Sequence, residues 1–107
     1  MKKEWIELYN GDILIAKQVS DNFMELVDNS VELPFGLFSV EDKGEIIDIF
    51  HFYKWLLMRV FPEDRIGVQD LLKAMNLQTY DKASIVRKAN GRMFQDNFNV
   101  KWVTSNV

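Results

Sequence analysis

The dipeptide Asn10-Gly11 stands between two stretches of alternating apolar and polar residues, and it constrains the fold more than any other feature. A two-residue hairpin turn needs positive φ at both central residues, and Asn-Gly adopts this conformation readily. With these two residues as the loop, Leu8 faces Ile13 on one side of the hairpin. The same register sets Glu4 opposite Lys17, a small favourable cross-strand pair. We therefore expect an antiparallel hairpin at the amino terminus.

A second turn pattern at Asp21-Asn22 predicts a third strand, Phe23 to Val27, with Val19 opposite Met24. Residues 1–32 then form a three-stranded antiparallel meander. An extended apolar connector follows, in which Pro34 fixes φ and disfavours helix in the residue before it.

Ser39 is predicted to begin a long central helix that ends at about Val60 or Phe61, since Pro62 cannot continue it. Residues 39–42, Ser-Val-Glu-Asp, resemble a capping box. On a helical wheel, one broad arc of this helix is apolar and is the expected core face. That arc holds Ile46, Ile49, Phe50, Tyr53, Leu56, Leu57, Val60 and Phe61.

The opposite arc is mostly charged but also carries Phe52 and Trp55. Two large apolar side chains among charges are either a second buried face or a site for a partner. Aromatic and arginine residues are enriched among the contacts that dominate protein interfaces. The candidate partner-binding residues are therefore Phe52, Trp55, Met58 and Arg59.

Two short helices are expected after Pro62, near Val68 to Met75 and near Lys82 to Ala89, with Asp81 as a cap and Asn90-Gly91 as the end of the second. A closing strand is expected from Asn97 to Val103. The 107 residues favour one domain. The predicted class is α+β, with the meander in residues 1–32 and a helical part with its closing strand in residues 33–107.

Composition excludes several chemistries. There is no cysteine, and His51 is the only histidine, so thiolate sites and mechanisms with two imidazoles are excluded. No phosphate loop or metal-ligand spacing is present. We expect no enzyme activity and no cofactor or metal. The amino terminus lacks a signal-peptide pattern, and residues 46–61 are too short and too charged to span a bilayer, so a soluble cytoplasmic protein is expected.

The net charge of −3 is unevenly distributed. Residues 1–50 hold four lysines against eleven acids, and residues 51–107 hold nine basic residues against five acids. We interpret this asymmetry first as two halves that attract each other within one fold or as charges that are only solvated. The basic half also suggests a second hypothesis, nucleic-acid binding, although a pI of about 5.1 is unlike that of a strong DNA binder. The candidate residues for it are Lys82, Arg87, Lys88, Arg92 and Lys101.

Four stretches carry a family resemblance. They are Leu33-Pro34-Phe35-Gly36-Leu37, residues 55–65 from Trp55 to Arg65, Leu71-Leu72, and residues 96–100. Together they resemble the amino-terminal segment of HipA-like serine/threonine kinases of Gram-positive bacteria. The sequence departs from that family at residues 93–95, where the family has Leu-Ser before the aspartate.

The resemblance implies a stand-alone accessory segment, because the chain stops where the kinase fold of that family would begin. Arg59, Pro62 and Arg65 would then define the shape of the helix end. Such segments are similar to regulatory partners in toxin–antitoxin operons and to orphan genes of phages and mobile elements. The leading hypothesis is a non-catalytic module that docks onto another protein through the Trp55 face. The alternatives are a nucleic-acid-binding regulator and a phage-encoded inhibitor of a host defence complex, and the oligomeric state stays open.

Overall fold

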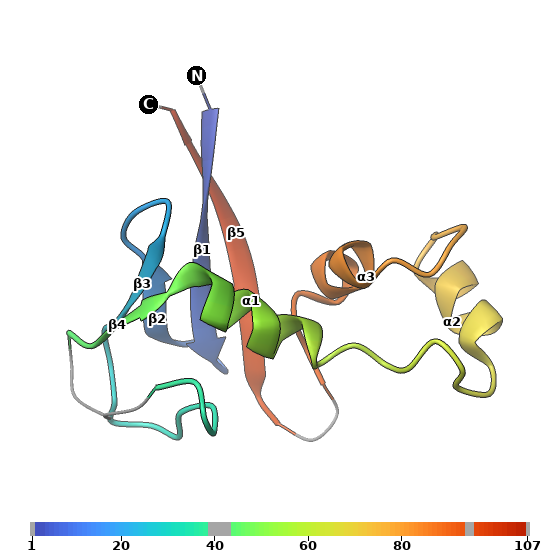
Figure 1. Ribbon diagram of the computed structural model, residues 1–107, viewed down its shortest axis with the longest axis horizontal. Helices are drawn as coiled ribbons and strands as arrows, with labels where there is room; N and C mark the ends of the chain where they lie inside the picture. The colour runs from blue at the N-terminus through green and yellow to red at the C-terminus, as the bar shows by residue number, and fades with distance from the viewer. Residues whose placement is uncertain (1, 39–43, 94–95, 107) are drawn as a thin grey trace.

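The computed structural model describes residues 2–38, 44–93 and 96–106 (Figure 1). Its centre is one antiparallel sheet with the strand order β4-β3-β2-β1-β5. The predicted meander forms the middle of this sheet, and a strand from the later part of the chain closes it on each side. The strands are β1 (Lys2–Asn10), β2 (Ile13–Gln18), β3 (Phe23–Leu26), β4 (Ile46–Asp48) and β5 (Phe98–Asn106).

Three helices complete the described chain: α1 (Ile49–Leu57), α2 (Val68–Ala74) and α3 (Lys82–Ala89). Figure 1 shows α1 lying across the sheet, whereas α3 and α2 lie beside it, beyond β5. The radius of gyration is 14.7 Å, against about 13 Å for a compact chain of this length. The predicted α+β class and both short helices are confirmed. We call the sheet with α1 the sheet half and the part that holds α2 and α3 the helical half, which extends outward from the sheet (Figure 1).

The first hairpin forms, but its predicted register is wrong. Asn10 pairs with Ile13, so the loop is Gly11 and Asp12, and Lys17 lies opposite Glu7 where Glu4 was expected. The reason is a turn shifted by one residue, in which Gly11 has a φ of +59°. At the next turn, Met24 pairs with Gln18 and not with Val19.

A bulge in β2 changes which residues reach the core. Tyr9 pairs with Leu14 and Leu8 with Ala16, so Ile15 is one extra residue in the strand. A bulge of this kind allows two consecutive side chains to be buried, although side chains normally alternate between the two faces of a strand. Ile15 and Ala16 are both fully buried.

The predicted long helix is wrong over residues 44–48. Its predicted cap at residues 39–42 lies outside the described residues. Ile46 and Ile47 form β4 against Glu25 and Met24, because β-branched residues pair well along the edge that β3 leaves open. Asp48 then caps α1, and its side chain accepts a hydrogen bond from the backbone N–H of Phe50 at 2.7 Å.

The helix also ends earlier than expected, at Leu57. The next residues tighten into shorter turns, in which the backbone N–H of Arg59 donates to the Leu56 carbonyl at 3.1 Å and that of Val60 donates to the Leu57 carbonyl at 3.4 Å. This tighter turn places Arg59 beside the chain that leaves α3.

The face of α1 that is buried in the structure differs from the predicted core face. Ile49, Phe52 and Leu56 are buried, whereas 74% of Phe50 and 38% of Tyr53 is exposed. Both arcs carry large apolar residues, so the sequence pattern could not choose between them. The junction of β4 and α1 decides, because pairing and capping fix the direction in which each residue of α1 points.

The closing strand is confirmed and is longer than expected, since β5 pairs with β1 over nine residues. On one face, Phe98 and Val100 are buried under the helices and Trp102 packs against the core. On the other face, the pairing sets opposite charges side by side across four strands, in the order Lys101, Glu7, Lys17 and Glu25. This alternation suits a face that meets water.

Candidate functional site

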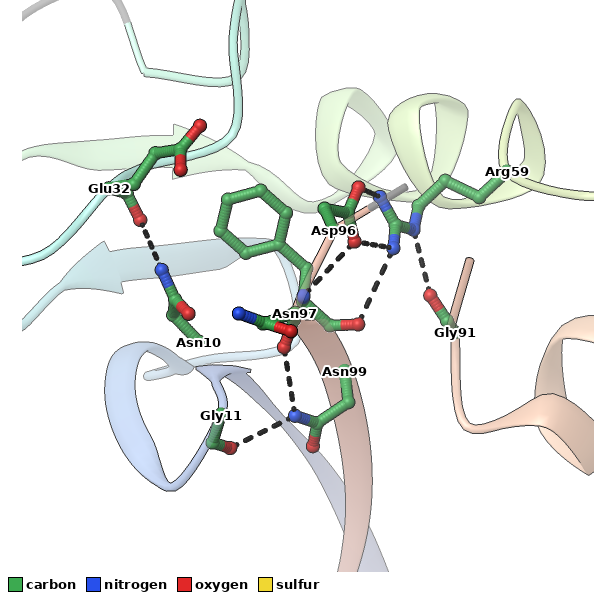
Figure 2. Close-up of polar contacts among 9 residues, drawn as sticks. Asn10, Gly11, Glu32, Arg59, Gly91, Asp96, Asn97 and Asn99 are labelled. Carbon is green, nitrogen blue, oxygen red and sulfur yellow. Dashed lines mark hydrogen bonds and ion pairs between the residues drawn. The ribbon is translucent and has the colours of Figure 1, made fainter. Parts of the chain in front are cut away.

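Arg59 joins the end of α1 to the start of β5 (Figure 2). Its Nε donates to the Gly91 carbonyl at 2.7 Å. Its two terminal nitrogens donate to the two carboxylate oxygens of Asp96 at 2.8 and 2.7 Å, and one of them also donates to the Phe98 carbonyl at 3.4 Å. Such a paired geometry is among the strongest hydrogen-bonded arrangements in proteins.

The Arg59 guanidinium is also covered by aromatic rings. It lies 4.7 Å from the centre of the Trp55 ring and 5.8 Å from that of Phe98. Only 6% of its side chain is exposed. Because Arg59 hydrogen-bonds both carboxylate oxygens, it holds the pKa of the Asp96 carboxyl below its ordinary value, although burial opposes this shift. Arg59 therefore stabilises the fold, and little of its side chain is exposed for contact with a partner.

A second polar cluster ties the first hairpin turn to the same strand start (Figure 2). The side-chain amide of Asn99 donates to the Gly11 carbonyl at 3.0 Å, and the Gly11 N–H donates to the Asn97 carbonyl at 2.9 Å. The Asn10 amide donates to the Glu32 carbonyl at 3.0 Å. These contacts explain why the chain holds a polar Asn99 that is only 9% exposed.

A hollow lies beyond this anchor, between the chain that leaves α1 and the helices α2 and α3. We call it the α2–α3 groove, and its volume is about 820 Å³. Its walls are mainly apolar. The apolar side chains that line it include Met58, Phe61, Leu71, Met75, Ile85 and Met93.

The groove exists because the helical half has a small core of its own. Leu72 and Ile85 are each only 2% exposed, yet neither belongs to the main cluster under the sheet. The hydroxyl of Tyr80 donates to the Phe61 carbonyl at 2.5 Å, and the two rings meet edge to face with centres 5.9 Å apart. Helices of seven and eight residues cannot fill the remaining space.

The charges at the groove are of one sign. Arg65 and Arg92 line it and are exposed, and of the described residues no aspartate or glutamate lines it. Arg92 also lines a smaller hollow of about 280 Å³. Asp12 shares that hollow, but it forms no ion pair with Arg92.

The four predicted partner-binding residues are not brought to one surface. Phe52 has none of its surface exposed, so for this residue the alternative of a buried face holds. Trp55 is half-buried, and its ring packs against Phe52 and Phe98 with centres 5.8 and 6.1 Å apart. Met58 is 76% exposed and lines the groove. Sequence reasoning missed Met75 and Met93, which the clustering of methionines at adaptable surfaces could have suggested.

The predicted basic cluster is also divided. Lys82 and Lys88 are exposed on α3, whereas Arg87 of the same helix forms an ion pair with Glu4 and lies over the Trp102 ring at 5.0 Å. Lys101 lies over the Tyr9 ring at 4.5 Å, on the sheet face away from α3. With Arg92 at the groove, the five residues face at least three different directions.

Comparisons with known protein families, curated proteins and solved structures gave no match. The resemblance to the HipA-like amino-terminal segment therefore stays a prediction. The described part of the chain contains no cluster of three or more potential metal ligands. None of its helices is long and apolar enough to cross a membrane.

Proposed function

We propose that this protein is an interaction module that binds another protein through the α2–α3 groove. The observation that carries the proposal is the groove itself, a hollow of about 820 Å³ with mostly apolar walls. Pockets of this size are typical of binding sites, and apolar surface left exposed at one place marks an interaction site. Burying such walls against a partner would provide the free energy of binding.

The residues of the groove support this use. Met58 is 76% exposed and Met93 is 37% exposed, and both flank the opening. Methionine is flexible and polarizable, so it adapts its shape to a partner with little strain. The regulatory role that the family resemblance implies fits a module of this kind, and it remains a hypothesis.

The proposal is tested by affinity capture from nuclease-treated lysate of the source organism with three forms of the protein. Met58→Glu places a charge in the groove. Phe50→Glu is the matched control, because Phe50 is 74% exposed, belongs to the helix that Met58 caps and does not line the groove. We expect the wild type and Phe50→Glu to retain the same protein, and Met58→Glu to lose it.

Circular dichroism and melting temperature establish that the two variants are folded, which both should be because each changes an exposed side chain. Equal capture by Met58→Glu would contradict the proposal. Capture from untreated lysate that is absent after nuclease treatment would also contradict it and would favour the nucleic-acid hypothesis. Such binding should weaken steeply between low and moderate salt.

A further inference from the structure

We infer that the α2–α3 groove takes an amphipathic helix of a partner protein, with carboxylates flanking the apolar face of that helix. This inference rests on the proposed function and adds the chemistry of the partner. Three features of the described residues carry it: the sign of the charges at the rim, the kind of backbone that lines the groove, and the composition of the chain's own exposed helix face.

The rim charges select an acidic partner. Arg65 and Arg92 are exposed, and neither forms an ion pair with a described residue. Arg59 also lines the groove, but Asp96 already neutralises it. A partner that brings carboxylates to the two free guanidiniums gains complementary contacts, whereas one that brings lysines meets repulsion.

The walls favour a helix over an extended peptide. The groove is lined by α2 with its cap Met75, by α3, and by the irregular residues 58–65 and 91–93, and none of the five strands of the described chain lines it. An extended peptide binds well where a strand edge offers N–H and carbonyl groups, and that edge is missing here. A helix satisfies its own backbone and needs only an apolar groove.

A second copy of this chain is a poor occupant. In α1 of a second copy, the exposed apolar side chains Phe50 and Tyr53 have Lys54 beside them, and the helix contains no acidic residue apart from its cap, Asp48. Docking this face would bring a lysine toward Arg65 and Arg92. The charges at the rim therefore favour a different protein over a second copy.

The test uses synthetic peptides and the full chain labelled with ¹³C at the methionine methyl groups. The first peptide is a stapled helix with leucines on one face and glutamates on its flanks, and the second has lysines in place of the glutamates. Met58, Met75 and Met93 report on the groove, and the fully buried Met24 is the internal reference. We expect saturable shifts of the groove methyls with the glutamate peptide and about tenfold weaker binding of the lysine peptide.

Charge reversal provides the second arm. The double variant Arg65→Glu, Arg92→Glu should invert the preference and bind the lysine peptide more tightly. Lys88→Glu makes the same kind of charge reversal at an exposed residue of α3 outside the groove lining. It should leave the preference for the glutamate peptide unchanged. An equal response of both variants would overturn the role of the rim.

The outcomes separate this inference from the proposed function. Equal affinity for both peptides would overturn the acidic partner and leave the groove as a docking site. Equal binding of a proline-containing glutamate peptide that cannot form a helix would overturn the helical partner. Groove methyl shifts that depend on protein concentration alone would indicate a second copy. If neither peptide binds although capture depends on Met58, the inference fails and the proposed function stands.

Discussion

The two halves of this molecule are held together by different means. In the sheet half, β5 is paired with β1 over nine residues, and Leu8, Ile15 and Val100 have no exposed surface. In the helical half, Leu72 and Ile85 are the buried apolar residues outside the main cluster, and a groove of about 820 Å³ stays open beside them. Strand pairing supplies order through backbone hydrogen bonds, whereas short helices depend on side-chain packing for most of their stability.

This difference indicates which half of the molecule can leave a binding surface open with the smaller loss of stability. A groove inside the sheet half would remove apolar burial from the one sizeable core, at a cost of about 25 cal/mol per Å². The contacts that join the helical half to the sheet half include the hydrogen bond of Arg59 to Gly91, the packing of Val86 into the main cluster, and the pair of Arg87 with Glu4. Substitutions in the core of the sheet half, and at these contacts between the halves, which we call joints, test the comparison.

The largest effect is expected at the core of the sheet half. Phe52→Ala should lower the free energy of unfolding by about 3–5 kcal/mol, since it removes a fully buried ring and leaves a cavity. Phe50→Ala should change it by less than about 1 kcal/mol, because Phe50 is 74% exposed. Urea denaturation of both variants measures the difference. Similar losses would mean that the helix faces the sheet with the other arc.

The next effect is expected at the buried joint. Arg59→Ala should lower the free energy of unfolding by about 3 kcal/mol, because it leaves the Asp96 carboxylate and two carbonyls without their donor. Arg59→Lys should recover only part of the loss, since an ammonium cannot make the paired contact. Full recovery with lysine would show that the charge matters and the fork geometry does not.

The same joint predicts a dependence on pH. The folded-state pKa of Asp96 is lowered from 3.8 by its hydrogen bonds to Arg59. Its contribution to stability is therefore fully present above the unfolded value and is lost as pH falls through the lower folded value. The stability difference between wild type and Asp96→Asn should be constant from about pH 5 to 8 and should shrink below about pH 4. A difference that grows in acid would contradict the ion pair.

A smaller effect is expected where α3 meets β5. Gly91 has a φ of +67°, and a Cβ there would lie 2.9 Å from the Val100 Cγ2 and 3.0 Å from the Leu56 Cδ1. Gly91→Ala should therefore cost about 2 kcal/mol, part from backbone strain and part from the close approach. Gly67→Ala is the control, because Gly67 has a φ of +83° in open space and should cost about 1 kcal/mol. Equal melting temperatures for the two variants would show that the halves do not press together at Gly91.

The smallest effect is expected at the exposed joint. Glu4 forms an ion pair with Arg87, but 40% and 52% of their side chains are exposed. The hydrogen bond from Arg87 lowers the pKa of Glu4. Glu4→Gln should change the free energy of unfolding by less than about 1 kcal/mol, and the change should diminish in high salt. A larger, salt-independent change would mean that this pair is a main joint of the halves.

The two short helices were the most predictable parts of the fold. Asn90-Gly91 ends α3 as expected, with both residues at positive φ. The closing strand and its buried side also followed from alternation. The registers did not, because a bulge at Ile15 and a turn moved by one residue depend on how β1 pairs with both neighbours.

The candidate site was predictable only in part. Met58 was expected at a partner surface and does line the groove, whereas Phe52 and Arg59 proved to be buried. A helix with large apolar residues on both arcs does not reveal which arc is covered. Leu71 and Met75 share one apolar stripe of α2 and its cap, but nothing in the sequence links that stripe to Met58 or to Met93.

The sequence by itself determined the α+β class, the presence of the first two hairpins and the amphipathic character of each short helix, because these follow from local backbone preferences and periodicity. The tertiary structure alone decided that residues 46–48 form a strand, which arc of α1 is buried and that an open groove remains. Those features depend on contacts between residues far apart in the chain. A local pattern that is compatible with both a helix and a strand, or with either buried face, takes one structure only when distant segments pack against it.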